Sequence, residues 1–344
     1  MGVQFPFFMK KPITISDIAI KLDISKSTVS RALKDHPDVN PETKRRVKAL
    51  AEKLDYEPNL LASSLAKKQS NLIGVILPEF NRTFFSSALE GIQHVARANG
   101  FNVIICQSNE EFENEVLNTK MLASNKVAGI LMSLTLQTED FSHLRKLQDK
   151  NIPFVLFDRV ADNVDCPKVT VDDFQGAYQV TSHLIKKGYK NIAHLSGPLG
   201  LSISKKRYEG FMKALDDHGF DQANAQVYEC KLLNEDAYHS ARKLLELNKD
   251  RPDAIFCVSD YVAFEAMRCI RDLGLRIPED VALAGFTNDP ATNYVTPPLT
   301  TMEQPAKLIG EKACELLLQH LKSEEHSEFP HLELPTNLIE RGST

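Results

Sequence analysis

The sequence lacks any apolar run that approaches the ~18 residues of a membrane span. Its opening segment, MGVQFPFFMK, has neither a basic start nor a long apolar core before a cleavage site. It is therefore not predicted to be a signal peptide, and Met9 is an alternative start to Met1. These absences argue against a membrane protein and against an exported one, so a cytoplasmic location is expected.

Paired cysteines and catalytic motifs are also missing. The 6 cysteines form no C-x-x-C pair, and several lie in apolar runs such as NVIICQS and AIFCVSD, so buried free thiols are expected rather than disulfides or a metal site. The chain has no G-x-G-x-x-G, no G-x-x-x-x-G-K-[ST], no G-x-S-x-G and no H-E-x-x-H. We predict no enzyme, no cofactor and no metal. A sugar kinase or hydrolase of α/β type remains the enzymatic alternative.

What the sequence does contain begins at Ile13, where ITISDIAIKLDISKSTVSRAL predicts two short helices joined by a tight turn. Thr14 is expected to cap the first helix, residues 15–22, with Asp17 completing a capping box. Ser25 is expected to cap the second, residues 26–34. Asn40 and Pro41 announce a third. This arrangement fits a helix into the major groove of DNA.

The second predicted helix carries its polar residues on one exposed face. N-terminal residues of such a helix reach base edges in the major groove, where Lys and Arg meet hydrogen-bond acceptors. Lys26, Ser27 and Arg31 are the candidates for reading bases. The other predicted DNA contacts are hydroxyl residues: Thr14, Ser25, Thr28 and Ser30. The alternative is a three-helix unit with a solvated charged face.

Charge divides unevenly along the chain. Residues 1–70 hold 13 Lys and Arg against 8 Asp and Glu, whereas the remainder holds 28 against 38. A basic head joined to an acidic body suits a nucleic-acid module attached to a sensor that does not itself bind DNA.

From Asn71 onward, short apolar runs alternate with amphipathic segments. The predicted strands are LIGVILP, FNVIICQ, AGILMSL, PFVLFD, KVTVD, NIAHLSG, AIFCVSD and VALAGF. Such runs are typical of parallel strands buried on both faces, and two doubly wound subdomains are the most economical arrangement. Ligands of these sheets bind beyond the carboxyl ends of the strands, here in the cleft between the halves.

The chain resembles the LacI/GalR (lactose-repressor) family of bacterial transcription regulators. The resemblance runs from Ile13 to the C-terminus through TISDIA, VSRAL, YEPNLLASSLA, QSNLIGVILP and PPLTTMEQP. It implies an α/β fold class: an N-terminal helix-turn-helix head, a hinge helix, and a periplasmic-binding-protein-like body whose chain crosses three times between two doubly wound parallel-sheet subdomains. The expected segments are an extension 1–12, a head 13–58, a hinge 59–70 and a body 71–344, divided into about 71–171 with 299–328 and about 172–298 with 329–340.

The resemblance also implies how DNA is bound. Residues 59–66 would form a hinge helix that orders on operator DNA, with Leu65 wedged into the minor groove, Ala62 beside the groove wall and Asn59 at its start. The alternative is a flexible linker of small residues. Two heads on a homodimer would read a near-palindromic double-stranded operator. No leucine heptad follows the body, so a dimer is expected rather than a tetramer.

A small-molecule effector is expected in the cleft, on residues that follow strands. The family pattern places ligand-stacking aromatics at Phe84 and Phe85, whose alternative is the core, and an ion-capable pair at Asp158 and Arg159, whose alternative is a structural salt bridge. Arg207 matches the family arginine that binds hydroxyls, carboxylates or phosphates. Ser259 and Asp260 match the family pair after a later strand, and Asp260 can equally cap the next helix.

One position departs from the family pattern. Sugar-binding members commonly carry Asp directly after a G-Y or G-F, whereas this chain reads AGFTND, with Thr287 there and Asn288 beyond. The effector is therefore expected to carry fewer hydroxyls, to carry negative charge, or to be read by Asn288. A solute-binding protein of a transport system would share the body fold, but it needs an export signal and has no use for a basic head.

Overall fold

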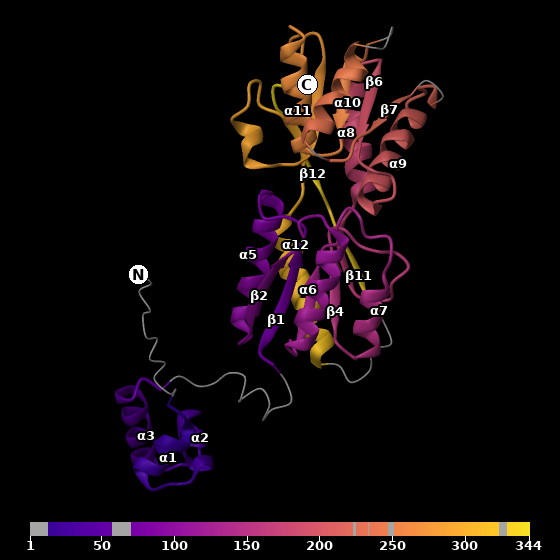
Figure 1. Cartoon of the computed structure of the whole chain (residues 1–344). Coiled ribbons are helices and arrows are strands. Elements are labelled where there is room, and N and C mark those ends of the chain that lie inside the picture. Colours follow the sequence, from indigo (N-terminus) through magenta and orange to yellow (C-terminus); the bar gives the residue numbers. More distant parts are fainter. Residues whose placement is uncertain (1–12, 57–69, 223–224, 233, 247–250, 323–328) are drawn as a thin grey trace, which may run out of the picture. The chain divides into compact units, whose positions relative to one another are not determined.

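The computed structural model describes residues 13–56, 70–222, 225–232, 234–246, 251–322 and 329–344. The chain divides into two units, Met1–Ser70 and Asn71–Thr344, called here the head and the body. Figure 1 follows the chain through both.

The head consists of three short helices around a small apolar core. They are α1 (Ile15–Leu22), α2 (Lys26–Leu33) and α3 (Pro41–Lys53), which confirms the predicted helices to within one residue. The core forms because apolar residues recur on one face of each helix, and its fully buried members are Ile18, Val29, Ala32 and Val47.

The body contains two α/β subdomains, as the sequence predicted. The first is built on an all-parallel sheet of order β11-β5-β4-β3-β1-β2. Its strands are β1 (Leu72–Leu77), β2 (Asn102–Gln107), β3 (Gly129–Met132), β4 (Phe154–Phe157), β5 (Lys168–Val171) and β11 (His331–Leu334). Its helices are α5 (Thr83–Ala98), α6 (Phe112–Ser124), α7 (Ser142–Asp149) and α12 (Ala306–Lys322).

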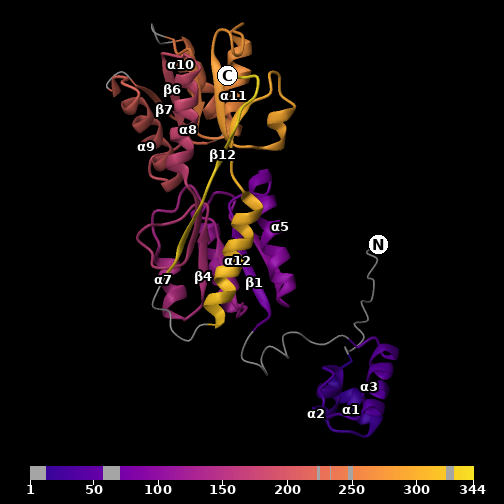
Figure 2. The same cartoon turned by 180° about the vertical axis from the view of Figure 1, so that it is seen from behind.

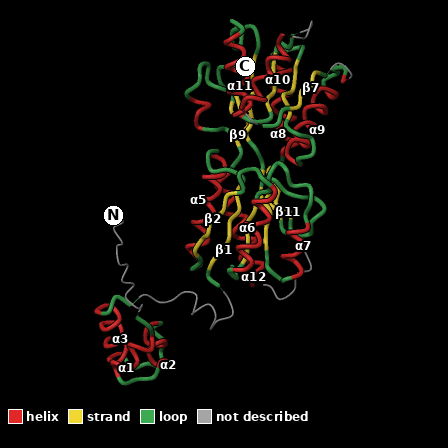
Figure 3. Tube along the Cα trace, viewed as in Figure 1, coloured by secondary structure: helices red, strands yellow, loops and turns green. Residues whose placement is uncertain are grey.

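The second subdomain has a sheet of order β12-β10-β9-β8-β6-β7, in which only the pairing of β10 with β12 is antiparallel. Its strands are β6 (Ile192–Ser196), β7 (Gln226–Glu229), β8 (Ala254–Cys257), β9 (Ala282–Thr287), β10 (Thr300–Glu303) and β12 (Asn337–Ile339). Its helices are α8 (Asp173–Lys186), α9 (Ser202–Asp217), α10 (Asn234–Glu246), α11 (Asp260–Asp272) and the 3-10 turn η2 (Pro290–Asn293). Figure 3 shows helices flanking the strands of both subdomains.

The chain crosses between the subdomains three times, but two crossings differ from the expected boundaries. Residues 299–303 were assigned to the first subdomain, yet β10 pairs with β9 in the second sheet. Residues 331–334 were assigned to the second, yet β11 pairs with β5 in the first. The crossings therefore lie at 304–305 and 335–336. Four strands, β7, β10, β11 and β12, were not predicted, because their short polar sequences lack an apolar run.

Helices α5 and α12 pack against each other in the first subdomain, and they lie side by side in both views of the body (Figure 1, Figure 2). A β-carbon built on Gly310 would lie 1.9 Å from the carbonyl oxygen of Ala88, and one on Gly91 would lie 2.1 Å from that of Lys307. Glycine is thus required at both positions for the two backbones to touch.

We expect Gly310→Ala to lower the free energy of unfolding of the body by at least ~2 kcal/mol, because overpacking against a backbone carbonyl outweighs the better helix propensity of alanine. Denaturant unfolding would measure the loss. Gly200→Ala is the matched control, since a β-carbon there meets no atom within 4 Å. Equal stability of the Gly310→Ala protein and the control would show that α5 and α12 can separate at no cost.

Candidate functional site

In the head, side-chain hydrogen bonds cap the N-termini of α1 and α2. Thr14 and Asp17 form the predicted capping box at α1, and the hydroxyl of Ser25 accepts a hydrogen bond from the Thr28 amide at 3.1 Å. Between the helices, Asp23 adopts a left-handed conformation with φ 52°, and the Ile24 amide bonds back to the Ala19 carbonyl at 3.1 Å. The turn is therefore fixed by local hydrogen bonds.

The outer face of α2 presents the predicted base-reading residues. Lys26, Ser27 and Arg31 are exposed, while Val29 and Ala32 on the opposite side are buried. This separation follows from the helical period and leaves a cation, a hydroxyl and a guanidinium on one surface. Of the other predicted contacts, Thr14 and Ser25 serve as caps and are also exposed, whereas Thr28 and Ser30 are half-buried. Asn59, Ala62 and Leu65 lie outside the described residues.

In the body, a cavity of about 60 Å³ lies between the subdomains, called here the inner cavity. It is bordered by residues that follow strands of both sheets, as the rule for ligand sites of doubly wound sheets requires. Seven of the nine predicted effector residues line it: Phe84, Phe85, Asp158, Arg159, Arg207, Ser259 and Thr287.

Arg207 is held firmly in the wall of this cavity. Its Nε donates to the carboxylate of Asp173 at 2.8 Å, and its Nη1 donates to the carbonyl oxygen of Val258 at 2.6 Å. The guanidinium also lies over the ring of Phe286, 3.7 Å from the ring centroid. Because Arg207 and Asp173 are both buried, the positive charge is neutralised within the protein.

Arg159 is neutralised in the same way. Its Nη1 donates to both carboxylate oxygens of Glu110, at 2.7 and 2.9 Å, and its guanidinium faces the ring of Phe85. Its Nε is buried and has no hydrogen-bond partner among the described residues. Arg159 thus forms a structural salt bridge, which was the alternative given for it, and the partner is Glu110 and not the sequence neighbour Asp158.

Asp158 remains as an acidic group with one weak partner, the Ser133 hydroxyl at 3.4 Å. Burial raises the pKa of its carboxyl to about 6, against the opposing effect of the Arg159 and Arg207 charges. A carboxyl in this state can either donate or accept a hydrogen bond near neutral pH.

Two predicted effector residues lie elsewhere. Asp260 is fully buried, and its carboxylate accepts hydrogen bonds from the Thr301 hydroxyl at 2.6 Å and the Asp289 amide at 2.7 Å, which joins α11 to β10. Asn288 lines a neighbouring cavity, and its side-chain amide is already bonded to Glu303 and Arg341. The structure thus gives both side chains partners within the protein.

Comparison with known proteins agrees with both units. The model described as "Bacterial regulatory proteins, lacI family" matches residues 14–59, and the model described as "Periplasmic binding proteins and sugar binding domain of LacI family" matches residues 70–340. The chain belongs to the LacI family. It is therefore a DNA-binding transcription regulator and not an enzyme.

Relatives and solved structures cover nearly the whole chain. The ribose operon repressor of Halalkalibacterium halodurans is 33% identical over 96% of this chain and 97% of its own length. Catabolite control protein A of Priestia megaterium is 31% identical over 96% and 99%. The lac repressor dimer bound to operator and the anti-inducer ONPF matches with a TM-score of 0.85 at 26% identity, over 97% and 99% of the two chains. A CelR–cellobiose complex matches with 0.74 at 26%, over 96% and 100%.

In this LacI-family body, six residues that line the inner cavity were not predicted from the sequence: Arg82, Ile203, Leu232, Val258, Tyr261 and Gln304. Arg82 pairs with Glu79 at 2.6 Å and lies over the ring of Tyr261, and Gln304 enters from the crossing segment. Arg82 follows β1 within EFNRTFF, so its position after a strand could have identified it. Gln304 carried no such signal, because β10 was not predicted.

No helix among the described residues is long and apolar enough to cross a bilayer.

The raised pKa of Asp158 predicts an unusual pH dependence. The unfolded chain releases this proton near pH 4, whereas the folded chain keeps it to about pH 6, so the stabilising contribution is present at low pH and is lost as pH rises through that window. Asp158→Asn should remove this loss and gain up to ~3 kcal/mol over wild type between pH 4 and 7.

Chemical denaturation of both proteins across this pH range would measure the difference. The exposed residue Asp162, mutated to Asn, is the control and should track wild type at every pH. Parallel curves for wild type and Asp158→Asn would contradict the assignment.

Proposed function

We propose that this LacI-family regulator responds to an uncharged, hydroxyl-bearing small molecule, a sugar in the simplest case, bound in the inner cavity, and that it acts as a repressor. The observation that supports this proposal concerns the arginines that line the cavity. Within the described residues, the guanidinium of each one already pairs with a carboxylate. The pairs are Arg82 with Glu79, Arg159 with Glu110, and Arg207 with Asp173.

This charge balance disfavours an anionic effector. A phosphate or carboxylate would have to compete with buried partners for each arginine, and Asp158 beside them adds a further acidic group. We therefore do not favour a negatively charged effector, which was one of the expectations drawn from Thr287 in place of the family Asp.

Hydroxyl groups of a ligand can form hydrogen bonds with the polar atoms of the cavity that lack a partner in the described residues. Arg159 Nε and Gln304 Nε2 are buried donors without a partner in the described part of the chain, and Asp158 offers a carboxyl. The rings of Phe84 and Phe85, 5.3 Å apart in an edge arrangement, border the same space. Both also belong to the apolar core of the first subdomain, which was the alternative given for them, and they are 9% and 2% exposed. Phe84, the more exposed ring, is proposed to supply the apolar surface on which a sugar ring stacks. The names of the ribose operon repressor and the CelR–cellobiose complex support this ligand class for the family.

The cavity volume of about 60 Å³ is far below the ~300 Å³ at which ligand sites usually begin. We therefore infer that the subdomains separate when a ligand enters. Several contacts between the subdomains hold them together: Thr83 donates to the Asp289 carboxylate, Arg82 donates to the Leu232 carbonyl at 3.1 Å, and Lys206 pairs with Glu333 at 2.8 Å. Effector binding would change the angle between the subdomains, and a coupling of ~1–3 kcal/mol to DNA affinity would suffice for regulation.

On DNA, a homodimer would place two heads on a near-palindromic operator. Lys26, Ser27 and Arg31 would read base edges, and the hydroxyls of Thr14, Ser25, Thr28 and Ser30 would contact the backbone. Asn59, Ala62 and Leu65, outside the described residues, are proposed to act in a hinge helix that opens the minor groove. Because operator DNA is the partner, we propose a cytoplasmic protein, in agreement with six buried free cysteines.

Arg31→Ala should weaken binding to the selected operator by ~1–3 kcal/mol and leave nonspecific binding nearly unchanged, because it removes a base contact. Selection from randomised duplexes would supply the operator, and fluorescence anisotropy at one stated salt concentration would measure both affinities. Lys53→Ala, at the far end of α3, is the control for loss of one positive charge. An equal loss on specific and nonspecific DNA would refute base reading by Arg31.

Neutral sugars should bind the full-length protein more tightly than their phosphates, by at least ~10-fold, because the arginines are already paired. Isothermal titration calorimetry with glucose, galactose and ribose against their phosphates would test this. Tighter binding of any sugar phosphate would contradict the proposed effector class.

A further inference from the structure

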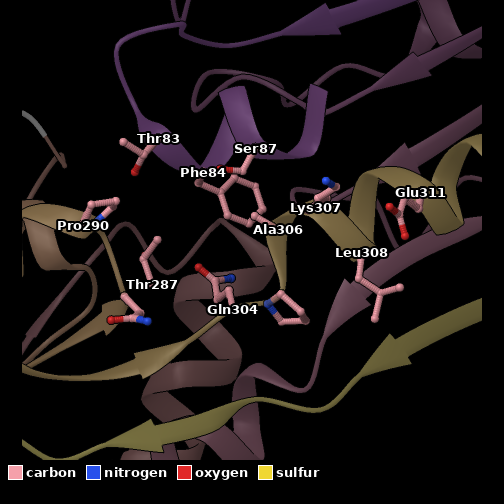
Figure 4. Close-up of a pocket in the computed structure, with 12 residues that line it drawn as sticks. Thr83, Phe84, Ser87, Thr287, Pro290, Gln304, Ala306, Lys307, Leu308 and Glu311 are labelled. Atoms are coloured by element: carbon pink, nitrogen blue, oxygen red, sulfur yellow. The ribbon is translucent and has the colours of Figure 1, made fainter. Parts of the chain in front are cut away.

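Another cavity lies on the second subdomain and does not border the cleft. It is called here the α8 cavity, because one face of α8 forms most of its wall, which His218 at the end of α9 and Leu338 of β12 complete. Its volume is about 390 Å³, within the ~300–1,000 Å³ range of small-molecule sites. It shares no lining residue with the inner cavity or with the neighbouring cavity at Thr287 and Gln304, which Figure 4 shows. Its occupancy is therefore independent of the cleft.

The wall of the α8 cavity is preformed. Tyr178, Ser182 and Lys186 recur at intervals of four positions, so they lie on one face of the helix. Helix α8 is held firmly against α9, since a β-carbon built on Gly210 of α9 would lie 2.2 Å from the carbonyl oxygen of Phe174. A ligand would therefore meet a fixed set of groups.

A buried hydroxyl of this wall lacks a partner. Ser182 is only 4% exposed, and its Oγ has no hydrogen-bond partner among the described residues. A hydroxyl in a helix can donate to the carbonyl one turn earlier, as the neighbouring Thr181 does to Ala177 at 2.8 Å. Ser182 makes no such bond, and a buried hydroxyl left unbonded costs free energy. An acceptor on a bound ligand would recover that free energy.

Lys186 supplies a cation to the same wall. It is exposed and forms no ion pair within the described residues, whereas the next residue, Lys187, pairs with Glu340. Burial lowers the pKa of His183, which also lines the cavity, so its imidazole is neutral near pH 7. Lys186 is therefore the permanent positive charge of this wall.

No carboxylate among the described residues lines the cavity, and those on the adjoining elements have partners elsewhere. Glu340, just after β12, pairs with Lys187. Asp217, the last residue of α9, accepts a hydrogen bond from Lys213 at 2.6 Å. Lys213 and, to a smaller extent, Tyr178 lower the pKa of the Asp217 carboxyl. The charge of Lys186 is thus left for a ligand.

A single cation favours a ligand with a single negative charge. A carboxylate carries one negative charge near pH 7, whereas a phosphate monoester carries about −1.5 to −2. Tyr178 and Leu338 add apolar surface beside the polar groups of the cavity. An organic carboxylate combines one charge, an acceptor for the Ser182 hydroxyl and an apolar body.

We propose that the α8 cavity is a second small-molecule site, separate from the effector site, and that it takes an organic monocarboxylate. Lys186 and the Ser182 hydroxyl hold the carboxylate, and the apolar body of the ligand lies against Tyr178 and Leu338. This inference does not depend on the identity of the effector in the cleft.

The test uses 4-fluorobenzoate and its neutral amide, 4-fluorobenzamide, titrated into the full-length protein and followed by fluorine NMR. The carboxylate should bind wild type at least ~10-fold more tightly than the amide. Lys186→Gln should abolish that preference, because it removes the charge. Lys187→Gln is the matched control and should retain the preference, because Lys187 is the exposed neighbour and does not line the cavity.

Ser182→Ala separates a ligand contact from a structural role. It should weaken binding of 4-fluorobenzoate by ~10-fold, since it removes a hydrogen bond to a charged group, and it should not lower the melting temperature, since the hydroxyl has no partner in the described residues. A lowered melting temperature with unchanged binding would assign the hydroxyl to the fold and remove it from the site.

Three results would overturn the site. They are equal affinity of wild type for the carboxylate and the amide, a preference that survives in Lys186→Gln, and an equal loss in Lys186→Gln and Lys187→Gln, which would indicate attraction by general surface charge. Inorganic phosphate that displaces 4-fluorobenzoate at lower concentration than benzoate does would overturn the monocarboxylate class. None of these results bears on the binding of neutral sugars in the cleft.

Discussion

The buried ion pair between Arg207 and Asp173 is the interaction on which the cleft depends. Asp173 is the first residue of α8, directly after the chain first crosses between the subdomains, and Arg207 lies on α9. Through Val258 and Phe286, the same guanidinium also contacts the ends of β8 and β9. Removal of either partner would leave an uncompensated buried charge, which typically costs 3–5 kcal/mol. One ion pair therefore aligns four elements at the edge of the cavity.

The pair also determines the chemistry of the cavity. A free arginine in a cleft attracts anions, whereas an arginine already bonded to a carboxylate contributes oriented N–H donors without net charge. Because Arg82 and Arg159 are paired as well, the cleft has little positive potential, and Arg159 Nε is its one buried arginine nitrogen without a partner in the described residues. This environment supports the proposal that the cleft selects an uncharged, hydroxyl-bearing effector.

The sequence predicted those elements whose signals are local. It did not predict the strands and side-chain pairs that depend on residues far away in the chain. Caps at Thr14 and Ser25, and apolar runs in the central strands, identified the head and most of both sheets. By contrast, β11 alternates exposed and half-buried residues, and only its pairing with Lys168–Val171 makes it a strand. The choice of Glu110 as the partner of Arg159 is likewise a long-range fact, 49 positions away in the chain. Because Arg159 follows a strand, the sequence could place it at the cleft. The sequence could not show that a carboxylate of the protein already pairs with its guanidinium.

The structure gives a physical reason for Thr287 at the position where sugar-binding family members commonly carry Asp. A carboxylate at this position would add negative charge near Asp158, whose pKa burial already raises to about 6. Two positions on, Asp289 carries a carboxylate that accepts hydrogen bonds from Thr83 and Tyr261 and so joins the second subdomain to α5 of the first. The carboxylate of Asp289 thus joins the two subdomains. Since Thr287 and Gln304 line the inner cavity close to this contact in the chain, a ligand held in that cavity would lie beside the residues that join the two subdomains.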